Sequence, residues 1–390
     1  MPCLLRFFER YRPRIAWLLI PALFLASTGC RPASSGSEPT PSLQAASATQ
    51  ISTIASSTAT PTDRDPTPPA LPPIPTNTTL PSSTPSPELV QLTSDGCCVE
   101  PFWSPDGSQV LFLDKPGEDS PAGFWSIGLS GGEPELFTDL LGVYSQDFTY
   151  VAYPSNGDTI VQHVVNGEKW VIPNGGISIS FSPDSSLIAW TEGDSGPPFD
   201  TARRRIYVSQ VGGTGARELA SFVGGGFASW FPDGRILASG RLSPQDEQQG
   251  FWIVSLDGAV DEILHTGRVR GASLSPGGNW LAYQVLFEED PAANGLWIAN
   301  TQTHESYKID LFGGYRWRDG NRLLVIPLDL DSPIHQLMEI DVSNRAVTAL
   351  TDPATTPFKV ANGDWTVSPN GKHLVFVSAD DHNLWLLPLP

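Results

Sequence analysis

Cysteine is scarce in this chain of 390 residues, which contains only four. Two of them, Cys3 and Cys30, lie in the first thirty residues, and the other two, Cys97 and Cys98, are neighbours. No second Cys or His pair stands at ligand spacing, so the sequence excludes a zinc pattern. The adjacent pair leaves three alternatives: a vicinal disulfide, two free thiols, or an intermolecular link. A vicinal disulfide would be strained, because neighbouring Cα atoms lie closer than the usual ~4.4–6.8 Å.

Basic residues are also few, since 23 Lys and Arg stand against 42 Asp and Glu, which gives a formal net charge of −19. The first 88 residues carry +1, so residues 89–390 carry −20. A domain this acidic repels nucleic acid and anionic lipid headgroups. We therefore expect no nucleic-acid partner. The simpler consequence of the same charge is solubility.

Catalytic motifs are missing as well. Residues 88–390 contain no His-Glu-x-x-His motif of a zinc peptidase, and their one Gly-x-Ser-x-Gly match, residues 128–132, stands in a turn between two strand-like runs rather than in the strand-to-helix elbow of a hydrolase. The six histidines are scattered along the chain, at His163, His265, His304, His335, His373 and His382. We therefore expect no catalytic residue, no metal and no cofactor.

What the chain does have is a short phrase that returns about every 44 residues, a period typical of repeat folds. The phrase is Ser-Pro-Asp-Gly or a close variant, at residues 104–107, 182–185, 231–234, 275–278 and 368–371. Proline presets φ and glycine accepts positive φ, so the phrase predicts a tight turn. Apolar runs rich in β-formers stand on both sides of it, which predicts a β-hairpin at each turn.

Each repeat contains four strand-like runs, and four antiparallel strands are typical of a propeller blade. Two further repeats are degenerate, with Gln146 and Arg318 in the slot of the proline. Counting them, the slots are 37 to 51 residues apart, which predicts an all-β, seven-bladed β-propeller over residues 88–390. If the weak second unit is not a full blade, the alternative is six blades.

The last repeat ends after its third strand, at Leu384–Pro390. A matching fourth strand, 89–93, stands alone before the first repeat. We therefore predict that this N-terminal strand completes the last blade and closes the ring, which leaves no sheet edge exposed.

The unit of Trp-Ser-Pro-Asp-Gly, an apolar strand, an aromatic-led strand and Leu-Thr resembles the repeat of TolB-type, WD40-like β-propellers. The resemblance covers residues 88–390 and is strong in five of the seven units. It implies an exported interaction or binding scaffold. Related propellers also occur fused to prolyl-peptidase domains and in oligogalacturonate lyases, so the phrase is specific for fold and nearly silent on function.

The N-terminal residues are predicted to be an export signal followed by a linker. Four arginines precede an apolar run, 15–26, that is too short to span a membrane comfortably. The sequence Ser27-Thr28-Gly29-Cys30 resembles a bacterial lipobox, although Ser27 replaces the usual leucine. This resemblance implies a lipoprotein signal peptide at 1–29, lipidation of Cys30, and export to the periplasm or cell surface. Residues 30–87 are rich in Ser, Thr and Pro, which predicts a disordered linker.

One set of residues that the repeat does not share is acidic. Alternating strands put the connections between second and third strands on the same face as the connections between repeats, and these connections carry many carboxylates. We call the following set the acidic rim: Asp114, Asp119, Glu192, Asp194, Asp246, Glu288, Glu289, Asp290, Asp329, Asp331, Asp380 and Asp381. Arg268 and Arg270 are expected on the same face, in a loop between repeats. Loops on a rigid scaffold often bind ligands, but charged loop tips also occur simply because they are solvated.

The leading hypothesis is a lipid-anchored, monomeric, non-catalytic scaffold that binds an envelope protein, peptide or glycan at the acidic rim. It would contact the membrane only through the lipid. The alternative is a metal-assisted polysaccharide lyase or hydrolase that uses the mouth of the propeller channel. A passive envelope module is the third hypothesis.

Overall fold

The computed structural model describes residues 88–193, 201–266, 269–329 and 332–390. The chain divides into two units, Met1–Thr78 and Thr79–Pro390, and every described residue belongs to the second. The predicted signal peptide (1–29), Cys30 and the linker (30–87) lie outside the described residues. Within the described ranges the fold is all β, and no helix is present that could cross a membrane.

Among the described residues the strands form five four-stranded sheets and one seven-stranded sheet. The first two four-stranded sheets contain β2 (Val99–Trp103), β3 (Gln109–Asp114), β4 (Gly123–Gly128) and β5 (Glu135–Thr138), then β6 (Val143–Tyr144), β7 (Tyr150–Ser155), β8 (Asp158–His163) and β9 (Lys169–Ile172). The seven-stranded sheet contains β10 (Ser180–Phe181), β11 (Leu187–Gly193), β12 (Arg203–Gln210), β13 (Arg217–Trp230), β14 (Ile236–Arg241), β15 (Gln249–Val254) and β16 (Val260–Thr266).

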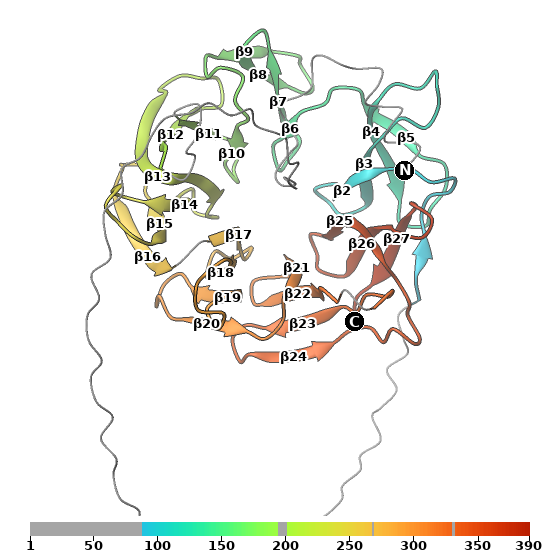
Figure 1. Cartoon of the computed structure of the whole chain (residues 1–390). Helices are drawn as coiled ribbons and strands as arrows, with labels where there is room; N and C mark the ends of the chain where they lie inside the picture. Colours follow the sequence, from blue (N-terminus) through green and yellow to red (C-terminus); the bar gives the residue numbers. More distant parts are fainter. Residues whose placement is uncertain (1–87, 194–200, 267–268, 330–331) are drawn as a thin grey trace, which may run out of the picture. The chain divides into compact units, whose positions relative to one another are not determined.

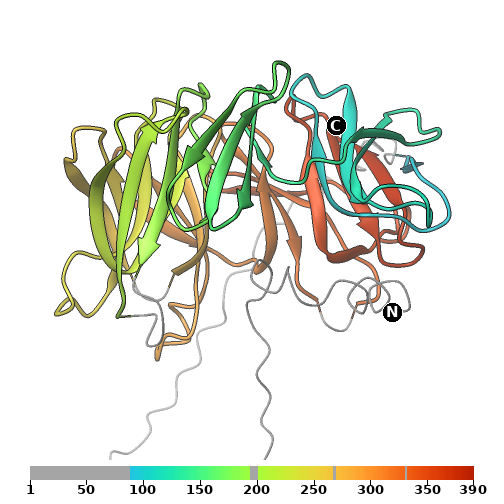
Figure 2. The same cartoon turned by 90° about the horizontal axis from the view of Figure 1, so that it is seen from above.

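The other three sheets follow the same order along the chain. They contain β17 (Val269–Leu274), β18 (Trp280–Val285), β19 (Gly295–Asn300) and β20 (Ser306–Ile309), then β21 (Gly313–Trp317), β22 (Arg322–Pro327), β23 (Met338–Asp341) and β24 (Ala346–Ala349), and finally β25 (Val360–Val367), β26 (His373–Ser378), β27 (Leu384–Pro388) and β1 (Val90–Gln91). The sheets follow one another around a ring, with strands such as β2, β17, β21 and β25 nearest the centre (Figure 1). Seen edge-on, the strands run between the two faces of the ring (Figure 2). The arrangement is the predicted β-propeller.

The seven-stranded sheet arises from β13, which pairs with two neighbours in turn. Its first part pairs with β12 up to Val223, and its second part pairs with β14 from there to Trp230. Three glycines, 224–226, stand at the crossover, and a Cβ atom at Gly225 would lie 1.9 Å from the carbonyl oxygen of Ser239. These glycines let the chain pass from one pairing to the next without a loop. The sequence predicts separate four-stranded units here, whereas the structure joins them.

The N-terminal strand pairs with the last strand, as predicted. β1 is antiparallel to β27, with Val90 opposite Leu386 and Gln91 opposite Trp385. The Leu92 N–H donates to the carbonyl oxygen of Leu384 at 2.8 Å, and the Leu384 N–H donates to Thr93 Oγ1 at 2.8 Å. The two ends of the described chain are therefore held in one sheet.

The core is divided into clusters, most of which lie between neighbouring sheets. The seam between the sheet of β2–β5 and the sheet of β6–β9 is different, because no fully buried cluster fills it among the described residues. Partly exposed aromatic rings with centroids 5.1–6.2 Å apart pack there instead, from Phe102, Phe124, Phe137, Tyr144 and Phe148. This seam adjoins the unit that the sequence marks as degenerate.

The recurring phrase forms the turn between the first and second strands of a repeat. In the first repeat Ser104 Oγ donates to Asp106 Oδ1 at 2.7 Å, and the Ser108 N–H donates to the same oxygen at 3.0 Å. Gly107 takes φ +69°, which is left-handed backbone that favours glycine. Equivalent bonds join Ser145 to Asp147 at 2.7 Å and Ser182 to Asp184 at 2.6 Å. The phrase therefore specifies a turn closed by its own side chains.

These bonds predict a pH-dependent contribution to stability. The Ser104 hydroxyl, then the Ser108 amide and hydroxyl, lower the pKa of Asp106 to about 2. A carboxylate whose pKa is lower in the folded state stabilises the fold above its unfolded pKa of ~3.9, and this contribution is lost as pH falls toward 2. We expect Asp106→Asn to melt below the wild type at pH 6, with the gap closing near pH 2. Thermal melts across this range check it, and a gap that is constant with pH would contradict it.

Candidate functional site

Several residues of the acidic rim form hydrogen bonds with groups close to them in the sequence. Glu192 Oε1 accepts from the Trp190 indole at 2.8 Å, Asp246 Oδ2 from the Ser243 N–H at 2.9 Å, and Asp290 Oδ1 from the Ala292 N–H at 2.9 Å. Glu192 also lies in β11 rather than in a loop. These carboxylates are partly or wholly committed to loop geometry, which the sequence could not show.

Two rim residues have shifted pKa values with opposite signs. Burial raises the pKa of Asp114, the last residue of β3, against the hydrogen bond that it accepts from the Lys115 N–H at 2.7 Å. Burial also opposes ionisation of Asp381, but the hydrogen bonds from Asn383, Ser378 and the Trp385 indole together lower its pKa. Asp381 is therefore charged and fixed in place.

The remaining described members of the rim are more open. Asp119, Glu289, Asp329 and Asp380 are exposed, and Glu288 is half-buried. Asp194, Asp331 and Arg268 lie outside the described residues. The exposed carboxylates are the part of the rim able to attract a cationic ligand.

Arg270 does not lie in a loop between repeats, where the sequence analysis placed it. Arg270 is the second residue of β17 and Arg316 is the fourth of β21, both inner strands. The reason is that the preceding connections are short, so the inner strand begins earlier than expected. Arg270 is exposed beside a cavity of about 300 Å³, whose other walls include Ser239, Phe251 and Gly271.

A group of polar side chains gathers on three neighbouring inner strands, β2, β21 and β25. We call Glu100, Arg316, Asp364 and Trp365 the inner group. The Arg316 guanidinium carbon lies 5.3 Å from the centroid of the Trp365 ring. The Asp364 carboxylate takes a hydrogen bond from the backbone of Glu100 and lies within electrostatic range of Arg316 and the Glu100 carboxylate. Residues up to 265 positions apart in the sequence thus form one site.

Irregular backbone presents two members of the inner group. Glu100 has φ +54°, and the pairing of β2 with β3 shifts register between Val99 and Phe102. Asn362 and Gly363 also have positive φ, within the register shift that precedes Trp365. β-Bulges of this kind re-aim side chains and are frequent beside binding and active sites.

Burial shifts the pKa values of two members of the inner group. Desolvation, followed by repulsion from Glu100, raises the pKa of Asp364 despite the nearby Arg316. Desolvation also lowers the pKa of Arg316, which Asp364 and Tyr315 partly offset. Asp364 is half-buried, whereas Glu100 and Arg316 are exposed, so a partly desolvated carboxyl group lies beside two charged groups that reach water.

The adjacent cysteines stand between the closing strand and the inner group. Cys97 and Cys98 are joined by a disulfide, and Cys98 is buried in the cluster that contains Leu92, Leu384 and Leu386. Thr93 Oγ1 lies 3.1 Å from Cys97 Sγ, and the Gly96 N–H donates to Asn383 Oδ1 at 3.0 Å. The segment that leads from β1 into β2 is thus fixed from both sides.

In the described part of the chain, no three His, Cys, Asp or Glu side chains are placed to hold a metal ion. His335 Nδ1 instead accepts a hydrogen bond from the Val360 N–H at 3.2 Å, and the His373 ring stacks with the Trp103 ring. The donor set therefore does not fit a metal centre, and we derive no metal-dependent step.

Comparison with known proteins identifies the fold but not a family, since no family model and no curated protein matches the chain. An oligogalacturonate lyase in complex with manganese is 17% identical, with a TM-score of 0.55 over 78% of this chain and 98% of that one. An oligogalacturonate lyase from Vibrio parahaemolyticus is 14% identical, with a TM-score of 0.52 over 78% and 99% of the two chains. A TolB-type protein from Agrobacterium tumefaciens is 14% identical, with a TM-score of 0.37 over 77% of this chain and 96% of that one. At these identities the similarity shows the propeller fold alone.

Proposed function

We propose that the protein is a lipid-anchored, non-catalytic β-propeller that binds a protein, peptide or glycan of the cell envelope. In this proposal residues 1–29 direct export, Cys30 carries the lipid and residues 30–87 tether a monomeric propeller above the membrane. We take the seven-stranded sheet as two blades that share β13, which makes seven blades of the WD40-like type. The pairing of β13 with both β12 and β14 supports this count.

The observation that carries the proposal is the inner group. Arg316 rests on Trp365 and offers a planar donor fork for a carboxylate or a pair of hydroxyls. Glu100 is exposed and offers an acceptor on β2. A ligand chain that enters along the ring axis could bond to both, while the exposed carboxylates Asp119, Glu289 and Asp380 attract cationic groups on the same partner.

Pull-down from a native envelope extract tests the proposal. We expect the double variant Arg316→Gln, Asp364→Asn to retain about 10-fold less of the partner captured by the wild type, because charge-assisted hydrogen bonds are lost. Replacing Asp119, Glu289 and Asp380 by amides should leave binding less sensitive to salt.

The matched control is Glu133→Gln with Glu305→Gln, two exposed residues in turns on the opposite face. It should bind like the wild type. If the inner-group variant captures the same partner equally well, the inner group is not the site.

A second candidate is an enzyme that acts on polysaccharide at the same place. One observation favours it, because a carboxyl group with a raised pKa beside an arginine is typical of acid–base sites. Incubation with polygalacturonate separates the two candidates. Unsaturated products that form with the wild type and not with Asp364→Asn would replace the binding proposal with this one.

A further inference from the structure

A cavity among the described residues lies on the other face of the ring, between the turn after β13 and the turn after β17. Its volume is about 560 Å³, within the range of small-molecule sites. We call it the turn hollow, and its polar walls include Asp233, Arg235, Asp261, Asn279, Gln302 and His304.

The turn hollow lies where the repeated phrase departs from its pattern twice. In the turn after β13, Phe231 replaces the serine whose hydroxyl bonds to the aspartate in other repeats. In the turn after β17, Gly277 replaces that aspartate, so no side chain stands at the position. In the turn at residues 182–185, Ser185 Oγ also donates to Asp147 Oδ1 of the preceding turn at 2.9 Å. The residue at the same position in the turn after β17 is Gly278, which has no side chain to form such a bond.

These exchanges leave polar groups that face the hollow with unused bonding capacity. The Asp233 carboxylate accepts hydrogen bonds from the Arg235 N–H at 3.1 Å and from Arg235 Nε at 2.8 Å. These bonds take the place of the serine hydroxyl that bonds to the aspartate in other repeats. Gln302 Nε2 donates to Asn279 Oδ1 at 3.0 Å, which leaves the Asn279 amide N–H groups and Gln302 Oε1 available. Asp261 on β16 is exposed and contributes a second carboxylate.

The chemistry of the walls selects a class of ligand. Carboxylates, amides and a guanidinium together match a ring rich in hydroxyls, because each hydroxyl both donates and accepts. Apolar wall residues such as Phe231 and Ile253 are buried, so the hollow offers no aromatic face for a flat apolar ligand. Asp233 forms an ion pair with Arg235 at 2.8 Å, and the exposed carboxylate of Asp261 stands beside that pair, which favours a cation over an anion.

We propose that the turn hollow is a second binding site, separate from the inner group, and that it takes an amino sugar of one or two rings. The protonated amine meets the carboxylates of Asp233 and Asp261, and the ring hydroxyls meet Arg235, Asn279 and Gln302. This site does not depend on the function proposed for the inner group.

Calorimetric titration of the full chain at pH 6 tests the proposal, with the glucosamine disaccharide chitobiose as the probe. We expect saturable binding of this probe, about 10-fold weaker binding of its N-acetylated form, and none of digalacturonate. Asp261→Asn should weaken chitobiose binding by about 10-fold, because one charge-assisted hydrogen bond is lost.

The sharpest variant is Gly277→Asn, which restores a residue that the repeat itself uses. Asn370 occupies this slot in the last repeat, where its Oδ1 accepts from Ser368 Oγ at 2.8 Å. Gly277 has no left-handed φ, and a Cβ atom there meets nothing closer than 3.5 Å. We therefore expect a melting temperature no lower than that of the wild type and loss of chitobiose binding. If Gly277→Asn and Asp261→Asn both bind chitobiose like the wild type, if the acetylated or acidic sugars bind as tightly, or if no sugar binds, the proposal is overturned.

Discussion

Deleting residues 88–94 lowers the melting temperature of the full chain by about 10 °C or more. The deletion removes β1, the hydrogen bonds that Leu92 and Thr93 make with Leu384, and the buried side chain of Leu92, which is 3% exposed. It also exposes the edge of β27, where unpaired backbone groups favour aggregation. Differential scanning calorimetry, with light scattering to follow association, measures both effects.

Two further variants separate the effect of losing the strand from the effects of a shorter chain and of losing the Leu92 side chain. Removing seven residues from the predicted linker, 70–76, shortens the chain equally and should not change the melting temperature. Leu92→Ala keeps the strand but removes buried methyl groups, and it should cost about 2–5 kcal/mol. A melting temperature that is the same with and without residues 88–94 would mean that the ring does not depend on its N-terminal strand.

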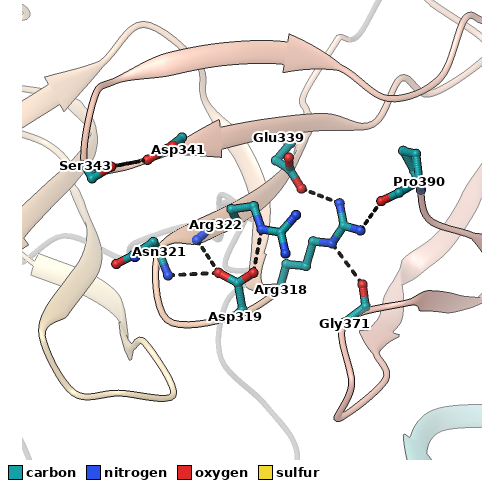
Figure 3. Close-up of polar contacts among 9 residues, drawn as sticks. All are labelled: Arg318, Asp319, Asn321, Arg322, Glu339, Asp341, Ser343, Gly371 and Pro390. Carbon is teal, nitrogen blue, oxygen red and sulfur yellow. Dashed lines mark hydrogen bonds and ion pairs between the residues drawn. The ribbon is translucent and has the colours of Figure 1, made fainter.

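Replacing Arg318 with methionine destabilises the propeller by about 3–5 kcal/mol, the usual cost of breaking a buried ion pair. Arg318 occupies the slot of the repeated proline and is 7% exposed. Figure 3 shows its guanidinium between three partners: Nη1 lies 2.6 Å from Glu339 Oε2, Nε donates to the Gly371 carbonyl at 2.9 Å, and Nη2 donates to an oxygen of Pro390. The side chain therefore ties its own sheet to the last one.

The neighbouring ion pair supplies a matched control. Arg322 and Asp319 also form an ion pair in Figure 3, but both side chains are substantially exposed. Arg322→Gln should cost only about 0–1 kcal/mol. The double variant Arg318→Met, Glu339→Leu should recover much of the loss, because no uncompensated charge remains buried. Denaturant unfolding measures all three, and equal losses for Arg318→Met and Arg322→Gln would contradict the role given to Arg318.

Arg318 also shows how a degenerate repeat can mislead a reading of the sequence. Because Arg318 replaces the proline of the repeated motif, it suggests only that the motif has been lost in this repeat. Nothing near it in the sequence indicates a buried charge. The partners Glu339, Gly371 and Pro390 are 21, 53 and 72 residues away. Only the packing of two sheets brings them together.

The candidate site was anticipated only in part. The sequence predicted a face with many carboxylates, but it gave no means of distinguishing one carboxylate from another. It could not show that Glu192 and Asp381 bond to indoles while Asp119 and Glu289 stay exposed. Asp364 was missed altogether, because it lies within a strand and its partner Glu100 is at the other end of the domain. A charged residue within an inner strand was the available signal.

What the sequence determined by itself was everything that depends on short-range chemistry. In four of the turns a serine bonds to an aspartate or asparagine two residues further on, and β-forming runs beside the turns make strands. The recurrence of that unit was enough to predict a propeller and its closing strand. The tertiary structure alone decided which side chains meet: the inner group across three strands, Arg318 across two sheets, and the hollow left where Phe231 and Gly277 interrupt the phrase. Those encounters depend on the order of sheets around the ring, which brings together residues that no local pattern connects.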